Sequence, residues 1–224
     1  MPRRAAEQFK NQLREWLERE SRNAETISVA KHWNVYNVGD QDQTVYIVES
    51  GQIKLLMVSP DGRECLLDIY TAGDVFGELC PAGSGERLEI ATAMVDSMLK
   101  RITCSNFRNF LGDHSLFDGF VQYLVVRIAS QQEVIASLVT NDSEHRLGEA
   151  LLMVARKLGK QHSHGIWIQP KITQEELSEM VGVTRPWISR LLEKFREHGL
   201  IDLSQKHALI IREEKLTAYL AERA

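Results

Sequence analysis

The sequence has few cysteines, and they are spaced too widely to suggest a disulfide framework. Its 224 residues contain three of them, Cys65, Cys80 and Cys104, with no C-x-x-C pair. Secreted disulfide scaffolds usually have an even and dense set, and zinc sites use closely spaced pairs. We therefore expect three reduced thiols and no cysteine-ligated metal.

Long apolar runs are also missing. The longest, Ala150 to Ala155, has six residues, whereas a membrane helix needs about 20. The charged start, Met1-Pro2-Arg3-Arg4, leads into no apolar stretch of the kind that forms a secretory signal. These absences predict a cytoplasmic protein with no membrane partner.

An excess of basic residues is missing as well, although many DNA-binding domains have one. Lys and Arg total 27 against 31 Asp and Glu, which gives a formal net charge of −4. Residues 1–140 carry a net −5, residues 141–224 a net +1, and the short stretch 184–197 a net +2. The charge balance therefore leaves DNA binding open and places it in the C-terminal part of the chain.

An amphipathic helix is predicted at the N-terminus, within residues 1–20. Its apolar residues, Phe9, Leu13, Trp16 and Leu17, share one stripe at helical spacing. We expect this stripe to pack against the rest of the protein.

Short β-prone runs fill the region from about residue 26 to residue 110. Turn glycines separate them at intervals of 12, 11 and 11 residues, at Gly39, Gly51, Gly62 and Gly73. Regular turns with short β-branched runs between them predict an antiparallel β-roll, or jelly roll. The predicted strands are 45–48, 53–58, 65–70, 90–94 and 99–102.

A long helix is predicted over about 115–140. Its apolar residues alternate at spacings of 4 and 3 for just over three heptads, with one polar member, Gln131. A helix that only packs on its own roll needs a single apolar stripe, whereas strict 4-3 alternation is typical of a parallel two-helix interface. The pattern favours a homodimer whose interface residues are Phe117, Val121, Leu124, Ile128, Gln131, Ile135 and Leu138.

Two short helices joined by a tight turn are predicted in residues 173–197. Thr173 and Glu176 form the capping-box pattern that starts the first helix, and Gly182 can take the positive φ that ends it. Thr184 is the expected N-cap of the second helix, and Pro186 lies in its first turn, where a missing N–H costs little. This arrangement predicts a helix-turn-helix.

The second of these helices carries side chains suited to DNA. Arg185, Ser189 and Arg190 lie on its outward face near its N-terminus, the part of this motif that reaches base edges. Arginine suits guanine because its planar fork donates to both O6 and N7. Lys194 is expected to reach phosphates, and Trp187 either packs against the first helix or contacts the DNA backbone. The predicted DNA-binding residues are Thr173, Thr184, Arg185, Pro186, Trp187, Ser189, Arg190 and Lys194.

Together these segments predict an α+β chain in three parts. The N-terminal helix and the β-roll occupy residues 1–112, the dimerisation helix 113–141, and a winged helix-turn-helix 142–224. The last boundary falls where Asn141-Asp142-Ser143 breaks the long helix.

This order of segments resembles the CRP/FNR family of bacterial transcription regulators, over about residues 25–215. Two passages carry the resemblance: Gly73-Asp74-Val75-Phe76-Gly77-Glu78-Leu79, and Ile172-Thr173-Gln174-Glu175-Glu176-Leu177 through Thr184-Arg185-Pro186-Trp187-Ile188-Ser189-Arg190. The resemblance implies a homodimer that binds a two-fold symmetric double-stranded DNA site. It also implies RNA polymerase as a partner and an effector that binds in the roll and modulates DNA binding.

The second helix of the helix-turn-helix, called the reading helix from here on, mixes features of the two main branches of that family. Arg190 matches the arginine with which both branches read guanine, Arg185 matches a further CRP-branch arginine, and Ser189 matches the FNR-branch serine. The glutamate that both branches use for a cytosine falls at Pro186, which has no side-chain acceptor. The resemblance therefore implies a relaxed or changed preference at that base.

The effector site resembles the family's only in part. Cyclic-nucleotide members have Phe-Gly-Glu-Leu and, later, Arg-Ser-Ala or a near variant; Gly77, Glu78 and Arg87 match, but Leu88 and Glu89 follow the arginine. Leu88 lacks a hydroxyl donor, and Glu89 adds a negative charge near the phosphate position. Gln131-Gln132 stand where the CRP branch places a Thr-Ser pair on the adenine. Cyclic AMP or another cyclic nucleotide, a different ligand, and no ligand all stay open. The candidate effector residues are Gly77, Glu78, Leu79, Arg87, Leu88, Gln131 and Gln132.

Other functional classes fit less well. A metal-dependent cupin enzyme needs several His and carboxylate ligands in its roll, but His32 is the only histidine between residues 25 and 112. Since no Ser/His/Asp or Cys/His arrangement stands out either, we expect neither an enzyme nor a metal site. The absence of cysteine before Cys65 argues against an FNR-type iron–sulfur cluster, whereas haem on His114 or Cys104 stays open. The helix-turn-helix disfavours a cyclic-nucleotide module that acts on a protein partner.

Overall fold

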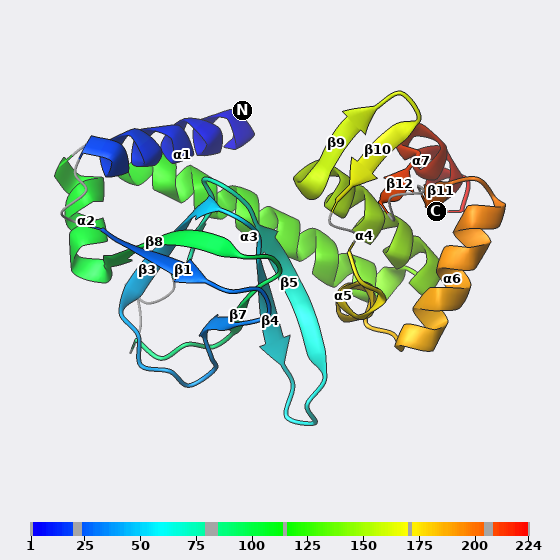
Figure 1. Ribbon diagram of the computed structural model, residues 1–224, viewed down its shortest axis with the longest axis horizontal. Coiled ribbons are helices and arrows are strands. Elements are labelled where there is room, and N and C mark those ends of the chain that lie inside the picture. The colour runs from blue at the N-terminus through cyan, green and yellow to red at the C-terminus, as the bar shows by residue number, and fades with distance from the viewer. Residues whose placement is uncertain are drawn as a thin grey trace. The chain divides into compact units, whose positions relative to one another are not determined.

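The structure is a computed structural model that describes residues 2–19, 24–78, 85–113, 116–169, 172–203 and 208–223. The chain divides into two compact units, Met1–Gln132 and Glu133–Ala224, and the long helix α3 (Phe117–Thr140) contributes to both. Both units contain helices and antiparallel sheet, so the chain is α+β (Figure 1). Within the described ranges, no helix is long and apolar enough to cross a membrane.

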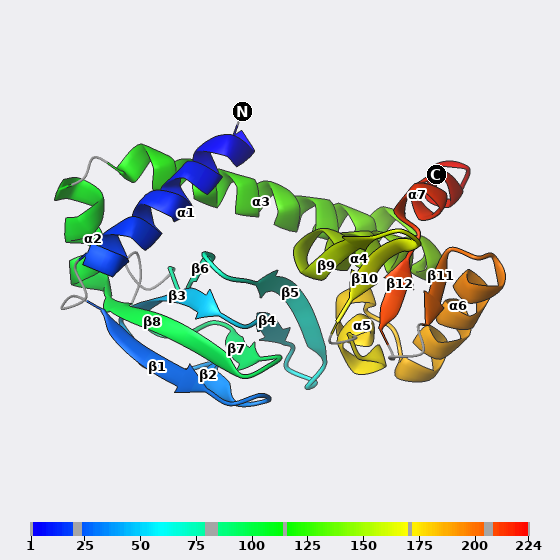
Figure 2. The same cartoon turned by 45° about the horizontal axis from the view of Figure 1, so that its top comes forward.

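The first unit contains the predicted roll. Two four-stranded antiparallel sheets, ordered β1-β8-β3-β6 and β2-β7-β4-β5, form it (Figure 2), so the expected antiparallel β-roll is confirmed. Gly51 takes a φ of +101° where β3 meets β4, and a Cβ there would lie 2.2 Å from Ser97 Oγ. This turn therefore needs glycine. The strands are β1 (Glu25–Val29), β2 (Asn34–Tyr36), β3 (Thr44–Ser50), β4 (Ile53–Val58), β5 (Glu64–Tyr70), β6 (Val75–Phe76), β7 (Ile90–Ala93) and β8 (Ser97–Thr103).

Helices cover a second core beside the roll. The stripe of α1 (Pro2–Arg19) is buried as expected, with Phe9 and Leu13 fully inside. Phe9 packs on Phe120 and Tyr123 of α3, with ring centroids 5.6 and 5.8 Å apart. A short helix, α2 (Cys104–Asp113), also joins this core. The β-prone region was expected to run to residue 110, and it ends at Thr103 instead.

The second unit contains the helix-turn-helix and its wing. Its four-stranded antiparallel sheet is ordered β11-β12-β10-β9, and β10 pairs with both β12 and β9. The elements are α4 (Ser143–Leu158), β9 (Gly159–His162), β10 (Gly165–Ile168), α5 (Gln174–Val181), α6 (Arg185–Glu197), β11 (Ile201–Leu203), β12 (Leu209–Ile211) and α7 (Glu213–Ala221).

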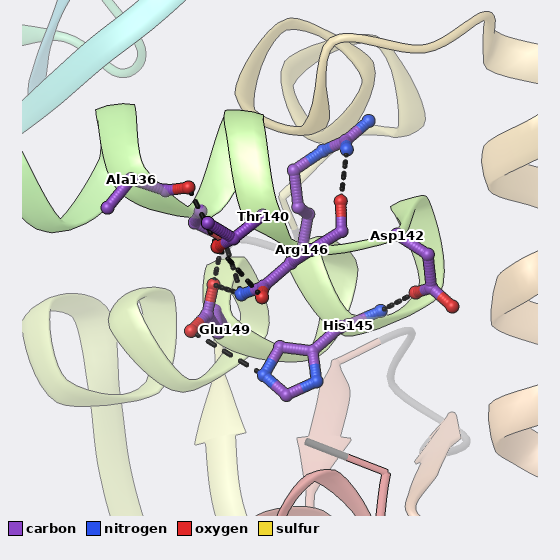
Figure 3. A network of polar contacts seen from close by, with 8 residues as sticks. Ala136, Thr140, Asp142, His145, Arg146 and Glu149 are labelled. Carbon is purple, nitrogen blue, oxygen red and sulfur yellow. Dashed lines mark hydrogen bonds and ion pairs between the residues drawn. The ribbon is translucent and has the colours of Figure 1, made fainter.

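A polar network joins the end of α3 to α4 (Figure 3), and Arg146 extends it to the end of α5. Asp142 caps α4 by accepting from the backbone N–H of His145 at 2.8 Å. The Arg146 guanidinium donates to the carbonyl of Asn141, at 2.8 Å, and to that of Val181, at 2.9 Å. One side chain therefore satisfies carbonyls at two helix ends and ties the turn of the helix-turn-helix to the end of α3.

The cysteines differ from expectation. Cys65 is a free thiol, and burial raises its pKa. Cys104 takes part in a disulfide, so the expectation of three reduced thiols is wrong at that position. Cys80 lies outside the described residues.

Candidate nucleic-acid interface and effector site

The first helix of the motif begins where the capping box places it. The Thr173 hydroxyl accepts from the backbone N–H of Glu176 at 3.1 Å, and the Glu176 carboxylate accepts from the backbone N–H of Thr173 at 2.7 Å. Gly182 ends α5 in the left-handed region, with a φ of 71°. Both ends of α5 are therefore set by local hydrogen bonds and backbone conformation, which fixes where the second helix starts.

The N-terminus of α6 presents its polar side chains to solvent. Thr184 is the N-cap without a side-chain capping bond, and Pro186 lies in the first turn, as predicted. Arg185 and Arg190 are both exposed. Neither forms an ion pair with any described residue, and Arg190 has its guanidinium carbon 6.0 Å from the ring centroid of Trp187. Two arginines of one helix end are thus available to an external acceptor.

Two other predicted contacts are already engaged inside the unit. The Ser189 hydroxyl donates to Gln174 Oε1, at the start of α5, at 2.8 Å. The Trp187 indole N–H donates to Ser143 Oγ at 2.9 Å, and the side chain is 42% exposed. This bond leads to α4 and not to the first helix of the motif. Trp187 is therefore anchored at one edge while the rest of its ring stays accessible.

Lys194, the expected phosphate contact, forms an ion pair with Glu144 on the first turn of α4, with Nζ 2.5 Å from Oε2. Sequence reasoning missed Glu144, Ser143 and Gln174. Gln174 is the first residue after the capping threonine, Thr173. A polar side chain at the start of α5 could have been predicted to contact the reading helix. Ser143 and Glu144 are more than 40 residues from their partners in sequence, and no local pattern indicates such pairs.

The predicted dimer stripe of α3 is largely exposed. Leu124 differs, because it is half-buried and packs against the core under α1, and Gln131 is partly exposed. Val125 and Val139 are exposed apolar residues that the heptad pattern did not include. A contiguous exposed apolar helix face is unusual in a protein unless another surface covers it. The exposed members of the predicted stripe are Phe117, Val121, Ile128, Ile135 and Leu138.

Arg87, the candidate phosphate ligand, is only 2% exposed and is held by groups of its own chain. Its guanidinium donates to the carbonyls of Gly77, at 2.9 Å, and Thr44, at 2.5 Å, and pairs with Asp42 at 2.7 Å. Its guanidinium carbon also lies 4.2 Å from the ring centroid of Tyr36. Gly77 permits this approach, because a Cβ on it would meet Arg87 at 2.8 Å.

The Asp42 carboxylate is charged in this arrangement. Burial raises its pKa, but hydrogen bonds from Thr44, Arg87 and Tyr46 together outweigh burial and leave the pKa below its usual range. A phosphate that approached Arg87 would therefore meet a carboxylate already paired with that side chain.

Glu78, like Arg87, forms an ion pair within its own chain. Its carboxylate pairs with Arg127 of α3, and both side chains are largely buried. The same guanidinium donates to the Tyr70 hydroxyl. The cation and the anion that a cyclic nucleotide would use are thus each neutralised within the first unit.

The remaining candidate effector residues are scattered. Leu88 is exposed, whereas Glu89 is buried and accepts from the Tyr36 hydroxyl at 3.2 Å. Burial raises the pKa of Glu89. Gln132 is exposed and Gln131 partly so, while Leu79 and the haem candidate His114 lie outside the described residues. Across the described part of the chain, no group of three His, Cys, Asp or Glu side chains could hold a metal ion.

Two family models match separate segments of the chain. Residues 26–114 match the family model of the cyclic nucleotide-binding domain, and residues 145–219 that of the Crp-like helix-turn-helix domain. The chain is 30% identical to a CRP-like cAMP-activated global transcriptional regulator of Mycobacterium tuberculosis, over 81% of this chain and 82% of that one.

Solved structures share the fold. A CooA variant from Carboxydothermus hydrogenoformans matches with a TM-score of 0.74 and 24% identity, over 89% of this chain and 88% of that one. The c-di-GMP responsive global regulator CLP of Xanthomonas campestris matches with a TM-score of 0.72 and 21% identity, over 88% and 97%. With its roll, long helix and capped helix-turn-helix, the chain belongs to the CRP/FNR family of transcription regulators.

Proposed function

We propose that this protein is a homodimeric regulator that binds two-fold symmetric double-stranded DNA in a sequence-specific manner. The observation that carries the proposal is the exposed pair Arg185 and Arg190 in the N-terminal half of the reading helix α6, which have no ion-pair partner in the described residues. The preceding helix α5 is fixed at its start by a capping box and at its end by the left-handed Gly182. A cytoplasmic location and regulation through RNA polymerase belong to the same proposal and rest on the family.

Each predicted residue has a role in this proposal. Arg190 and Arg185 donate to guanine edges in the major groove, and Ser189, held by Gln174, adds a further polar contact. Thr184 and Lys194 contact phosphates, which set position but not sequence. Thr173 supports this surface indirectly, because its hydroxyl and its backbone N–H both donate to Glu176 at the start of α5. Trp187 lies at the edge of the proposed DNA-binding surface. Pro186 supplies no acceptor, so the cytosine preference found in both branches is relaxed here.

Selection of binding sites from a random double-stranded DNA library tests this proposal with the wild-type protein. We expect an inverted repeat whose half-sites are one helical turn, about 34 Å, apart, with a guanine conserved in each half. Enrichment of asymmetric sequences, or of none, would contradict a symmetric dimer that reads DNA through α6.

For the effector, we propose that DNA binding does not require a cyclic nucleotide. The supporting observation is that the Arg87–Asp42 and Glu78–Arg127 pairs already occupy the charges such a ligand would need. Breaking a buried pair to admit a ligand is costly, because one charge is left without its partner. Activation by cyclic AMP, which is what the mycobacterial relative's name states of that protein, is the alternative.

Titration of the nucleotide-free protein with cyclic AMP separates these two possibilities. We expect no calorimetric heat at millimolar ligand and a DNA dissociation constant that changes less than about twofold. The Asp42→Asn variant serves as a comparison, because it removes the charge that neutralises Arg87. Stoichiometric heat together with tenfold tighter DNA binding by the wild type would establish cyclic AMP as the effector.

A further inference from the structure

Glu144 gathers donors from three different parts of the second unit. Its Oε2 pairs with Lys194 of α6, at 2.5 Å, and its Oε1 accepts from the Tyr219 hydroxyl of α7 and from Arg223, the latter at 3.0 Å. The Glu144 side chain is 15% exposed. A single carboxylate therefore holds two cations beside the reading helix.

Glu144 is ionised at neutral pH. Partial burial raises its pKa, but hydrogen bonds from Lys194 and Tyr219 outweigh that effect and leave it below the usual value. The carboxylate therefore cancels one of the two positive charges that Lys194 and Arg223 bring to this surface. The guanidinium groups of Arg185 and Arg190 have no such partner among the described residues.

This contrast separates two components of DNA binding. Contacts with the phosphate backbone act on every sequence and depend on salt, whereas contacts with base edges discriminate between sequences. Glu144 pairs with Lys194, the predicted phosphate contact, and with Arg223, and it pairs with neither Arg185 nor Arg190. The Glu144 carboxylate is thus placed to weaken the salt-dependent binding to backbone phosphates and to leave the base contacts unchanged.

We propose that Glu144 sets the overall DNA affinity by competing with backbone phosphates for Lys194 and Arg223. The inference rests on the proposed DNA-binding function and adds a residue that does not itself touch a base. Binding to specific and unrelated DNA is weakened by the same factor, so affinity is lowered and sequence preference is kept.

The reading helix is also held in position by contacts that do not involve Glu144. Ile188, Leu191 and Phe195 are buried on its inner face, and Trp187 is bonded to Ser143. The Glu144→Gln change keeps one oxygen acceptor for Tyr219, removes the charge and replaces the other oxygen with an amide NH2 group, which cannot accept from Lys194. It can therefore be made without displacing α6.

The test compares the wild type with Glu144→Gln on a selected site and on random DNA, across a range of salt concentrations. We expect Glu144→Gln to bind both DNAs about 2- to 10-fold more tightly, the range expected for release of exposed ion pairs. The slope of log affinity against log salt should steepen by about 2 to 4, since each protomer of the dimer releases one or two cations and each neutralised phosphate contributes about 0.9.

Two further variants assign the effect to the released cations. Glu222→Gln removes one exposed acidic charge next to Arg223 in sequence, and it should stay within about twofold of the wild type. Lys194→Gln should cost more affinity in the Glu144→Gln background than in the wild type. Glu144→Asp, which keeps the charge but withdraws it from Lys194, should give a smaller gain in the same direction.

The outcomes are distinguishable from failure of the proposed function. If the wild type binds neither DNA, the DNA-binding proposal itself fails. If the wild type binds but Glu144→Gln matches Glu222→Gln in affinity and salt slope, Glu144 does not compete with phosphates. Weaker binding by a folded Glu144→Gln protein would also overturn the inference and make Glu144 a structural support for α6.

Discussion

Replacing Ile128 with aspartate is expected to convert the protein into a folded monomer. Ile128 lies at the centre of the α3 stripe and is 52% exposed in the single chain, so the substitution disturbs no intrachain core. In a parallel helix pair the two aspartates would face each other. Like charges at such a position cost several kcal/mol, and at about 1.4 kcal/mol per tenfold this weakens the dimer at least 100-fold.

Sedimentation at micromolar concentration measures the result. Ala129→Asp is the matched control, because Ala129 is also exposed but is rotated about 100° away from Ile128 on the helix. We expect the Ala129→Asp control to remain dimeric and the Ile128→Asp variant to sediment as a monomer. The far-ultraviolet circular dichroism spectrum of the Ile128→Asp variant should match that of the wild type. A dimer that survives Ile128→Asp would show that α3 is not the interface.

The Arg190→Ala variant is expected to lose discrimination at one base pair in each half-site. A bidentate contact between arginine and guanine contributes about 1–3 kcal/mol, so a symmetric site with two half-sites loses about 2–6 kcal/mol. The loss should appear on the selected site and not on random DNA, because Arg190 is exposed and pairs with no described carboxylate. Arg185→Ala should act in the same way at a second position.

Binding measurements against sites mutated one base pair at a time test this result. Lys194→Ala is the matched control, since loss of a phosphate contact weakens binding about equally on all sequences. An Arg190→Ala protein with the wild-type base preference would remove Arg190 from the reading role.

Local patterns in the sequence predicted much of the fold. The capping box at Thr173, the left-handed Gly182 and the buried stripe of α1 are each determined by neighbours within a few residues. The predicted strands were found for the same reason, because turn glycines and β-branched runs are local signals. The helix α2 was missed because it is short and its first residues directly continue strand β8.

The side-chain partners could not be predicted in this way. Arg87 pairs with Asp42 across 45 residues, and Arg127 with Glu78 across 49. Periodicity indicates which face of an element a residue occupies, but not which distant side chain meets it. The candidate effector residues were therefore chosen by residue type, and the ion pairs of Arg87 and Glu78 became visible only with the fold.

Trp187 also gives this protein a built-in optical signal. Of the four tryptophans in the sequence, it is the one on the reading helix, half-exposed and anchored by its indole N–H. A variant with phenylalanine at Trp16, Trp33 and Trp167 would confine tryptophan emission to that helix. The arrival of DNA can then be followed by fluorescence from the protein itself, with no dye attached to either molecule.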